Sequence, residues 1–346
     1  MPTPAAPERR PRLTPAIADV RRAVRDALAT VATEEPALVL VALSGGPDSL
    51  ALAAATAFEA PRAGLRAGAV IIDHGLQSAS AEVAARAAAQ ADLLGLVPVI
   101  VRRVDVAKFT GGPEAAARDA RYAALADVSR ELGAVGVLLG HTLDDQAETV
   151  LLGLARGAGP TSLSGMDSVR DGLMRPLLGI RRSITVAACA DADLVPWNDP
   201  HNLDPAYARV RVRQSVLPML EAELGPGIAL ALARTAQQLR EDAEALDGMV
   251  EEIIEEIVEH AEAGIAISVP ALRANPAALA NRIIRFVTLS EFGVSLSRAQ
   301  TLAVAALVTD WRGQAGVDLP GIRVKREGGQ LVFASTKDLL ETKGES

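Results

Sequence analysis

Short apolar segments alternate with helix-length, Ala-rich segments through the first half of the chain. The apolar segments are residues 37–43, 67–73, 97–104 and 135–140, and the segments between them are residues 50–59, 79–94 and 114–132. Short strands without polar alternation are typical of a parallel sheet that is buried on both faces. The pattern therefore predicts an α/β fold with a doubly wound, mostly parallel sheet. Ligands of such sheets bind beyond the carboxyl ends of the strands, so we expect the chemistry directly after these apolar segments.

The pattern changes after the fourth predicted strand. Residues 145–220 begin as a helix and continue as irregular chain rich in Gly, Pro and Arg. Between Leu246 and Ala261 apolar residues return with a helical period and acidic residues occupy the other positions, which predicts an amphipathic helix with a solvated acidic face. A second helical region covers residues 277–309, and a small hairpin with its turn at residues 327–329 follows.

Three regions follow from these patterns. Residues 1–14 mix Pro with Arg and contain no apolar stretch, which predicts a disordered leader. Residues 15–220 are expected to form the α/β domain, and residues 221–346 a smaller, mainly helical domain with a short β-hairpin tail. No uncharged run approaches the ~20 apolar residues that span a bilayer, so we expect a cytoplasmic protein without a membrane partner.

The charge of the chain is unevenly distributed. The 346 residues include 35 basic and 43 acidic side chains, a formal net charge of −8, which taken alone argues against a nucleic-acid partner. Residues 241–262, however, carry ten acidic residues and no Lys or Arg, and the rest of the chain has a net charge of +2. Because 31 of the 35 basic residues are Arg, which binds phosphate bidentately, the charge does not exclude nucleic acid. The single cysteine, Cys189, excludes a disulfide framework and a Cys-based metal site within the chain.

The hexapeptide Ser44-Gly45-Gly46-Pro47-Asp48-Ser49 follows the first predicted strand and opens a helix. Its glycines let the backbone approach a phosphate closely, and the helix that follows presents its positive dipole end. The two serines supply hydroxyl donors, and Asp48 can hold a Mg²⁺ ion that bridges phosphate oxygens. The alternative is a plain strand–turn–helix connection with Ser or Asp as the N-cap. We predict a phosphate site, and not a Walker loop, because no Gly-Lys-Ser/Thr follows.

Polar residues also follow the second predicted strand and lie on the third predicted helix. The dipeptide Asp73-His74 ends the second strand, at the same edge of the sheet as the predicted phosphate site, although a turn with an incidental histidine is the alternative. On the helix, Arg118 and Tyr122 share a face and Arg121 is adjacent. An i,i+4 ion pair between Glu114 and Arg118 would explain both of those residues structurally.

The segment His141–Thr149 follows the fourth predicted strand and starts another helix. Asp144 and Glu148 are four residues apart, so we expect both carboxylates on one helix face. Two close carboxylates can bind a second Mg²⁺ ion, or hold and deprotonate an incoming amine. A primary alkyl amine has a pKa of about 10.4 and needs such a base near neutral pH. Asp145 with Glu148 also fits a capping-box pattern, which is the structural alternative.

These motifs resemble those of a known enzyme family. The hexapeptide resembles the pyrophosphate loop (PP-loop) of the N-type ATP pyrophosphatases, which split ATP between the α and β phosphates and adenylate an acceptor oxygen. Residues 141–149 resemble the HT-x-DDQ-x-ET signature of the tRNA(Ile)-lysidine synthetases within that superfamily, and residues 117–122 resemble their AR-x-x-RY pattern. Residues 156–178 and 197–218 contain segments similar to the family's RG-x-G, LSGM, RPLL, W-x-D-x-x-N and RNRIRH-x-x-LP, in that order.

Three positions depart from the family pattern. Gln77 replaces an arginine of an HGLR-type segment, and Val210 and Gln214 replace the Asn and His of the arginine-rich segment. The departures put in doubt a charge contact at Gln77 and the hydrogen bonds of the missing Asn and His. The arginines of that segment are intact. They could form phosphate contacts with tRNA, or a solvated edge.

The resemblance implies a fold, an activity and a set of site residues. The fold is Rossmann-like, and the activity is ATP-dependent ligation of free L-lysine to C2 of the wobble cytidine of tRNA(Ile) with a CAU anticodon, through an adenylated tRNA. The products are lysidine, AMP and pyrophosphate, with Mg²⁺ as the metal ion, and a homodimer is possible. The catalytic residues would be Asp48, Arg118, Asp144, Asp145 and Glu148. ATP would be bound by the hexapeptide with Asp73 and His74, metal by Asp48 and Asp144, and substrate by His141, Arg121, Tyr122, Arg175, Arg209, Arg211 and Arg213.

Three other functions would also use a phosphate loop of this kind. A tRNA thiolase on the same fold normally uses two cysteines, whereas Cys189 stands alone in an apolar segment. An amide ligase similar to NAD synthetase would leave the arginine-rich middle without a role. A non-catalytic nucleotide-binding module would keep the phosphate loop but would not need the acidic segment at residues 141–149. We therefore favour the lysidine-forming ligase.

Overall fold

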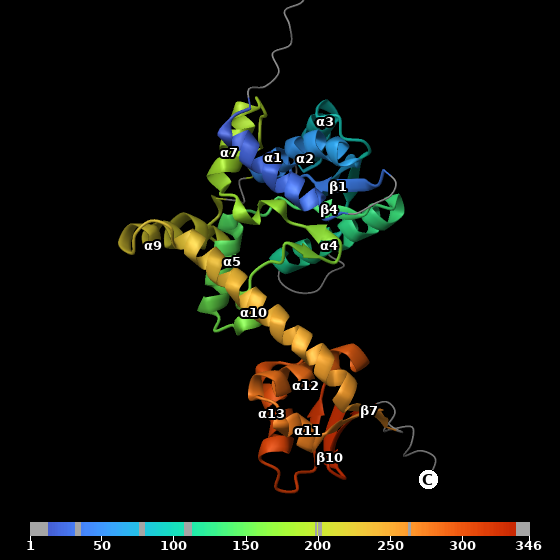
Figure 1. Ribbon diagram of the computed structural model, residues 1–346. Coiled ribbons are helices and arrows are strands. Elements are labelled where there is room, and N and C mark those ends of the chain that lie inside the picture. Colours follow the sequence, from blue (N-terminus) through green and yellow to red (C-terminus); the bar gives the residue numbers. More distant parts are fainter. Residues whose placement is uncertain are drawn as a thin grey trace, which may run out of the picture. The chain divides into compact units, whose positions relative to one another are not determined.

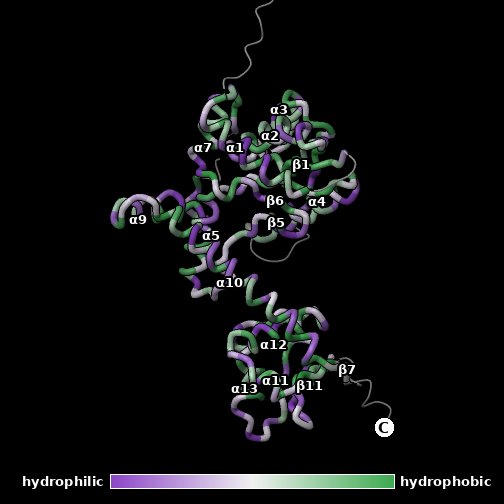
Figure 2. The backbone as a smooth tube through the Cα atoms, in the orientation of Figure 1, coloured by the Kyte–Doolittle hydropathy of each residue, from purple (hydrophilic) through white to green (hydrophobic). Residues whose placement is uncertain are grey.

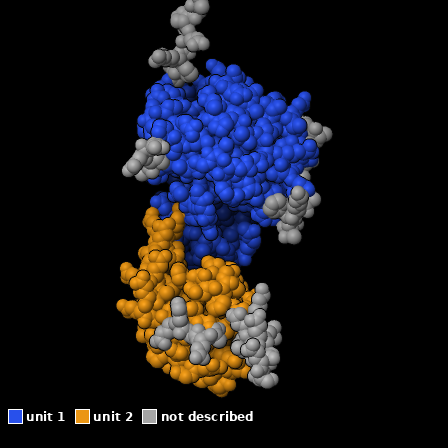
Figure 3. All heavy atoms as spheres, turned by 90° about the vertical axis from the view of Figure 1, so that its right-hand side faces the viewer, with its two compact units in different colours: residues 1–239 blue, residues 240–346 orange. Residues whose placement is uncertain are grey.

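The computed structural model describes residues 13–31, 36–75, 80–106, 113–197, 199, 203–261 and 264–336. The chain divides into two compact units, residues 1–239 and residues 240–346, which are coloured separately in Figure 3. Most of the predicted leader lies outside the described residues, but its last residue, Thr14, caps helix α1 (Pro15–Leu28) by accepting a hydrogen bond from Ile17 N–H.

The first unit is built on a six-stranded sheet. Its strands are β1 (Leu38–Ala42), β2 (Arg66–Asp73), β3 (Val99–Arg103), β4 (Gly136–Leu138), β5 (Val169–Arg170) and β6 (Leu173–Met174). They lie in the order β3-β2-β1-β4-β6-β5, and every neighbouring pair is parallel except β5 with β6. This confirms the predicted α/β class with a mostly parallel sheet.

Helices cover both faces of this sheet (Figure 1). Alternate residues of β1 enter two cores: Val39 and Val41 pack with α1, α2 (Pro47–Glu59), α3 (Ser80–Leu93) and α7 (Arg182–Asp191), whereas Leu38 and Leu40 pack with α4 (Pro113–Leu132). The side-chain period of two along a strand produces this division. The central strand is therefore buried on both faces, as the apolar pattern predicts.

The prediction of burial on both faces is wrong for β3. This strand is the edge of the sheet, and Val101 within it is 48% exposed. An edge strand lacks a neighbour and a full cover of helices on one side, which the local apolar pattern cannot reveal.

The remaining helices of the first unit follow β4. They are α5 (Leu143–Ala155), α6 (Pro160–Leu163), α7, α8 (Ala208–Arg211), a π-helix (Val212–Val216), α9 (Leu217–Glu223) and the first part of α10 (Ile228–Ile257). Short 3-10 helices cover Ala60–Ala63 and Pro176–Gly179.

The chain leaves β1 toward β2 on one side, and β4 lies on the other side of β1. The carboxyl ends of β1 and β4 thus form the point where the strand order reverses, which is where α/β sheets bind ligands.

The second unit contains a five-stranded antiparallel sheet. Its strands are β7 (Val258–Ala261), β8 (Gly264–Ser268), β9 (Val317–Leu319), β10 (Ile322–Glu327) and β11 (Gln330–Ser335), in the order β7-β8-β11-β10-β9. The end of α10 and helices α11 (Val269–Ala274), α12 (Ala277–Phe292) and α13 (Arg298–Thr309) belong to the same unit, and a core around Phe333 contains residues of the helices and the sheet. The predicted helices and the β10–β11 hairpin are confirmed, but the hairpin is part of a five-stranded sheet whose strands β7, β8 and β9 were not predicted.

Two details of the second unit differ from the expectations. Residues 258–261, expected to extend the amphipathic helix, form β7 because they pair with β8, with Val258 opposite Ile267. The helical region at residues 277–309 is two helices, since Gly293 ends α12 in the left-handed conformation (φ +65°) and a capping box begins α13. The amphipathic pattern of α10 itself is visible in Figure 2, where hydrophobic and hydrophilic residues alternate along it.

Among the described residues, no single helix has the length and apolarity needed to cross a membrane. The bent pair Ala208–Leu224 and Ile228–Ile257 meets both criteria only when its two parts are taken together.

Candidate active site

The loop after β1 has the geometry of an anion site. Gly45 has a left-handed φ of +82°, which favours glycine. Ser44 N–H donates to Ser49 Oγ at 3.2 Å, and Ser49 Oγ donates to the Gly46 carbonyl at 3.0 Å. Gly46 is the N-cap of α2 and provides no side-chain cap, so neither Ser nor Asp caps the helix as the structural alternative supposed. The amide groups at the start of α2 are thus left for a ligand.

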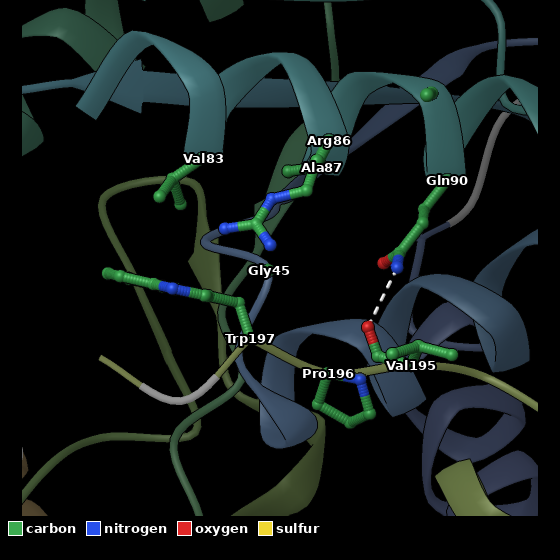
Figure 4. A pocket seen from close by; sticks show the side chains of 9 residues that line it. Gly45, Val83, Arg86, Ala87, Gln90, Val195, Pro196 and Trp197 are labelled. Atoms are coloured by element: carbon green, nitrogen blue, oxygen red, sulfur yellow. Dashed lines mark hydrogen bonds between the residues drawn. The ribbon is translucent and has the colours of Figure 1, made fainter. Parts of the chain in front are cut away.

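The loop is held closely against the neighbouring segments. A Cβ atom added to Gly140, at the end of β4, would lie 3.0 Å from backbone atoms of Asp48 and Ser49. In addition, Trp197 N–H donates to the Gly45 carbonyl at 2.9 Å. Beside Gly45 a pocket of about 400 Å³ is lined by residues that include Arg86 and Trp197 (Figure 4). The tryptophan of the predicted W-x-D-x-x-N segment therefore contacts the loop.

Asp48 points to the start of α7. Its Oδ2 lies 3.0 Å from Arg182 Nε, and its Oδ1 accepts a hydrogen bond from the Thr185 hydroxyl. Burial outweighs these partners and raises the pKa of the Asp48 carboxyl above its ordinary value. A further cation near Asp48 would therefore lower this raised pKa and favour the ionised carboxylate.

Two carboxylates of α5 share the same two arginines. Asp145 Oδ1 lies 2.6 Å from Arg182 Nη2 and 3.2 Å from Arg213 Nη2. Glu148, which is fully buried, accepts from Arg213 Nε at 2.7 Å and Nη2 at 3.0 Å, and lies 3.5 Å from Arg182 Nη1. Arg213 lies in the π-helix, a geometry often found at functional sites. Asp145 and Glu148, three residues apart, thus form the acidic pair of the site.

Asp145 also forms the start of α5. Its Oδ2 accepts hydrogen bonds at 2.8 Å from both the backbone N–H and the hydroxyl of Thr142, and Thr142 Oγ1 accepts in return from Asp145 N–H. The capping box is therefore Thr142 with Asp145, one turn earlier than the Asp145–Glu148 pattern suggested. Burial alone would raise the pKa of Asp145, but Arg182 and the Thr142 donors outweigh burial and lower it.

Asp144 has different partners from Glu148. Its Oδ2 accepts from the Arg182 backbone N–H at 2.7 Å, and its Oδ1 lies 3.1 Å from Arg181 Nη2. The structure therefore brings together Asp145 and Glu148 on shared arginines, where the sequence pattern suggested Asp144 and Glu148. The metal role of Asp144 stays a prediction.

A basic and aromatic cluster adjoins the acidic pair. Arg118 and Arg121 lie 5.0 and 5.5 Å from the centroid of the Tyr122 ring. Burial would raise the pKa of Tyr122, but the charges of Arg118, Arg121 and Arg175 lower it. Burial, with Arg121, Arg175 and Arg118 nearby, lowers the pKa of His141 to about 3, although Asp145 opposes this. Four of the seven predicted substrate residues therefore gather at one place with Arg118: Arg121, Tyr122, His141 and Arg175.

The other predicted ATP-site residues lie beside this cluster. Asp73 accepts a hydrogen bond from Gly75 N–H at 2.9 Å, and burial together with Arg121 lowers the pKa of His74. The Nδ1 atoms of His74 and His141 are buried and have no hydrogen-bond partner among the described residues. Buried polar atoms are rarely left unpaired, so these two nitrogens indicate a place for a ligand. Gln77 and the side chain of Glu114 lie outside the described residues.

The three arginines of the arginine-rich segment point in different directions. Arg209 donates to the Thr149 hydroxyl at 3.1 Å and is close enough to Arg121 to lower its pKa, after the larger effects of burial and Arg118. Arg213 binds the acidic pair. Arg211 donates to the carbonyls of Pro205 and Ala206 at 2.7 and 2.8 Å. The structure places two of the three at the site, and the tRNA contacts of all three stay a prediction.

The chain is similar to known proteins over most of its length. The family model of the PP-loop domain matches residues 19–220. A tRNA(Ile)-lysidine synthase of Leifsonia xyli subsp. xyli is 62% identical over 298 residues, which cover 86% of this chain and 90% of that protein. One from Salinispora tropica is 51% identical over 327 residues, covering 92% and 96%. The chain belongs to the tRNA(Ile)-lysidine synthase family.

The second unit and the fold agree with membership of the tRNA(Ile)-lysidine synthase family. The model of the TilS substrate binding domain matches residues 267–332, within the second unit. Among solved structures, the U34-tRNA thiolase NcsA from Methanococcus maripaludis, which holds a 4Fe–4S cluster, has a TM-score of 0.55 over 65% of this chain and 80% of its own length. At 21% identity this likeness shows the PP-loop fold alone.

Sequence reasoning missed three residues of this family member's site: Arg181, Arg182 and Thr185. A signal for the arginines exists, because two adjacent cations at the N-terminus of a helix are unfavourable with its dipole unless anions lie nearby. Sequence reasoning also missed the role of Gln146. Its side chain exchanges two hydrogen bonds with the backbone of Met166, at 2.7 and 3.0 Å, which links the acidic signature to the LSGM segment.

Carboxylate oxygens are suitable ligands for Mg²⁺, but the carboxylates of this site are not arranged around a common metal position. Among the described residues, no three acidic, His or Cys side chains are arranged as a metal site. Mg²⁺, however, usually takes one or two carboxylates together with substrate phosphates. Asp48, at the phosphate loop, meets that requirement once ATP supplies the phosphate oxygens.

Proposed function

We propose that this protein ligates free L-lysine to C2 of the wobble cytidine in tRNA(Ile) with a CAU anticodon, at the cost of one ATP. The C2 carbonyl oxygen attacks the α-phosphate and pyrophosphate leaves. The side-chain amine of lysine then attacks C2, AMP leaves with the former carbonyl oxygen, and the amine loses its proton to a base.

The observation that supports this proposal is the convergence of three groups at the carboxyl ends of β1 and β4. The phosphate loop lies there, the acidic pair Asp145–Glu148 contacts it through Arg182, and the cluster around Arg118 and Tyr122 adjoins His141. These groups suit a pyrophosphate, an ammonium and an anionic adenylate, respectively.

The loop is assigned to the departing pyrophosphate. Backbone amides at the start of α2 are fixed donors, so they stabilise the charge that develops on the leaving group. The hydroxyls of Ser44 and Ser49, bonded to each other at 3.0 Å, hold the loop in shape until ATP offers phosphate oxygens as acceptors. Asp48 would hold Mg²⁺, which neutralises phosphate charge when bound. Arg118, which is exposed beside Tyr122, is assigned to the adenylate phosphate.

The acidic pair is assigned to lysine. Asp145, with a lowered pKa, stays ionised near neutral pH and can hold an ammonium group. Glu148 lies beside it and shares Arg213, so the two carboxylates can bind the amine and accept its proton. Arg175, Arg209, Arg211 and Arg213 remain assigned to the tRNA substrate, and the second unit to tRNA binding. A cytoplasmic location and a homodimer stay predictions.

A direct assay tests the function. The protein is incubated with ATP, labelled lysine and either a CAU-anticodon tRNA(Ile) or another tRNA. We expect lysine-dependent AMP release and label in the tRNA(Ile) alone, and Asp48→Asn should abolish both. If lysine leaves AMP release unchanged and no label enters the RNA, the proposal fails. In a parallel incubation with a labelled sulfur donor, incorporation of sulfur into the tRNA would favour the thiolase, and tRNA-independent amide formation would favour the amide ligase.

A further inference from the structure

Arg182 lies among three carboxylates that come from two other helices. Its guanidinium contacts Asp48 at 3.0 Å, Asp145 at 2.6 Å and Glu148 at 3.5 Å. The arginine side chain is only 21% exposed, and that of Glu148 is fully buried. The guanidinium therefore occupies the point where three negative charges meet.

This point requires a cation. Arg213 compensates Asp145 and Glu148, but the cation paired with Asp48 within the described part of the chain is Arg182. Without Arg182, three partly or fully buried carboxylates would have one guanidinium between them. Removing one partner from such a buried cluster leaves uncompensated charge.

The ligands of the proposed function bring positive charge to the same oxygens. Mg²⁺ is assigned to Asp48, and the ammonium group of lysine to Asp145 and Glu148. These ions and the guanidinium cannot occupy one place, so a bound cation must take a carboxylate from Arg182.

We propose that Arg182 is an exchangeable counter-ion, whose guanidinium holds the three carboxylates together until Mg²⁺ binds Asp48 and displaces it. The backbone of Arg182 stays in place during the exchange, because its N–H donates to Asp144 Oδ2 at 2.7 Å at the start of α7. The released guanidinium remains beside the phosphate loop, where it can pair with phosphate oxygens. Arg182 is thus a positioning residue, and this inference rests on the proposed function through the metal assigned to Asp48.

Calorimetric titration with MgCl₂ alone, in which water takes the positions of the phosphate oxygens on the ion, tests the exchange on the full chain. In Arg182→Met the competing cation is gone, so we expect Mg²⁺ affinity to rise about tenfold or more over the wild type. The matched control Arg130→Met removes an exposed arginine that pairs with Asp127 on α4, and its Mg²⁺ affinity should equal that of the wild type. Equal Mg²⁺ affinity in the wild type and in folded Arg182→Met would overturn the proposal.

Two further variants locate the effect and guard against misfolding. Arg182→Lys keeps the charge but has a single ammonium group that cannot bridge three carboxylates, so its Mg²⁺ affinity should lie between those of the wild type and Arg182→Met. Adding Asp48→Asn to Arg182→Met should remove the gain; a gain that persists would place the ion elsewhere and contradict the proposal. Circular dichroism checks the fold of each variant. Because the titration contains neither lysine nor tRNA, failure of lysine ligation would sink the proposed function and leave this result standing.

Discussion

Burial and nearby charges shift the pKa of individual carboxylates of this site in opposite directions. Asp48 and Asp145 share Arg182, yet burial raises the pKa of Asp48 whereas arginine and backbone donors lower that of Asp145. The two histidines show the effect of burial among cations, which keeps both imidazoles neutral at neutral pH. The protonation state of each residue is therefore a property of its neighbours.

The buried neutral His141 should make stability depend on pH. Its pKa falls from 6.5 to about 3 on folding, so its contribution is fully present above about pH 6.5 and is lost as the pH falls toward 3. Between about pH 7 and pH 5 this group should remove up to ~2 kcal/mol of unfolding free energy. Urea unfolding at both pH values measures the loss, and His141→Gln should show a smaller one. An equal loss in the variant would contradict the assignment.

The thiol of Cys189 should react slowly in the folded protein. The thiol is 1% exposed, donates to the Pro47 carbonyl at 3.3 Å, and has a pKa that burial and Asp48 raise to about 12. We expect slow alkylation by iodoacetamide in the folded protein and rapid alkylation in urea, as mass spectrometry would show. Cys189→Ala should retain lysine ligation. Loss of turnover in a folded Cys189→Ala protein would point back to sulfur chemistry.

At the scale of elements, the start of α5 decides the geometry of the acidic pair. The Thr142–Asp145 capping box fixes its first turn, and Gln146 ties the same turn to the backbone of Met166. Gly165 makes this close approach possible, because a Cβ atom there would lie 2.5 Å from Gln146 Oε1. The acidic signature and the LSGM segment therefore act as one structural unit.

Two alanine substitutions separate close packing from backbone strain. Gly157 and Gly165 both have left-handed backbone, with φ of +66° and +71°, but only Gly165 has a neighbour within 4 Å of an added Cβ. Gly157→Ala should cost ~1–2 kcal/mol of unfolding free energy from strain alone. Gly165→Ala should cost at least ~1 kcal/mol more, because it displaces a buried, hydrogen-bonded amide. Equal costs in urea unfolding would show that Gln146 adapts freely.

At the scale of the molecule, charge separates into a near-neutral first part and an acidic stretch. The stretch at residues 241–262 begins on α10 and carries ten acidic residues, which explains the net charge of −8. Glu252 and Glu256 on this helix are exposed. We expect this acidic face to be turned away from bound tRNA, since phosphates would repel it.

The salt dependence of tRNA binding tests that expectation. Charge reversal by Glu252→Lys and Glu256→Lys should leave the slope of log K against log salt unchanged, whereas Arg211→Glu, an exposed residue assigned to the tRNA, should reduce it by about one phosphate contact. Filter binding of tRNA(Ile) over a salt series measures both slopes. A strong response to the two glutamate reversals would refute the orientation.

The sequence by itself determined the features that depend on neighbours along the chain. Apolar runs define β1, β2 and β4, because a strand buried on both faces needs no polar residues. The glycines of residues 44–49 and the acidic segment at residues 141–149 carry their chemistry in consecutive positions. These local patterns were enough to predict the fold class and the phosphate loop.

Only the tertiary structure decided which charges meet. Arg182 lies 134 residues from Asp48, and no periodicity along the chain relates the two. Arg182 of α7 and Arg213 of the π-helix each contact both Asp145 and Glu148 of α5. Asp144 instead accepts a hydrogen bond from the backbone of Arg182. In the second unit, pairing with β8 turned residues 258–261 from predicted helix into strand. Hydrogen bonds and ion pairs between distant segments set these outcomes, and a sequence pattern records only the groups available to form them.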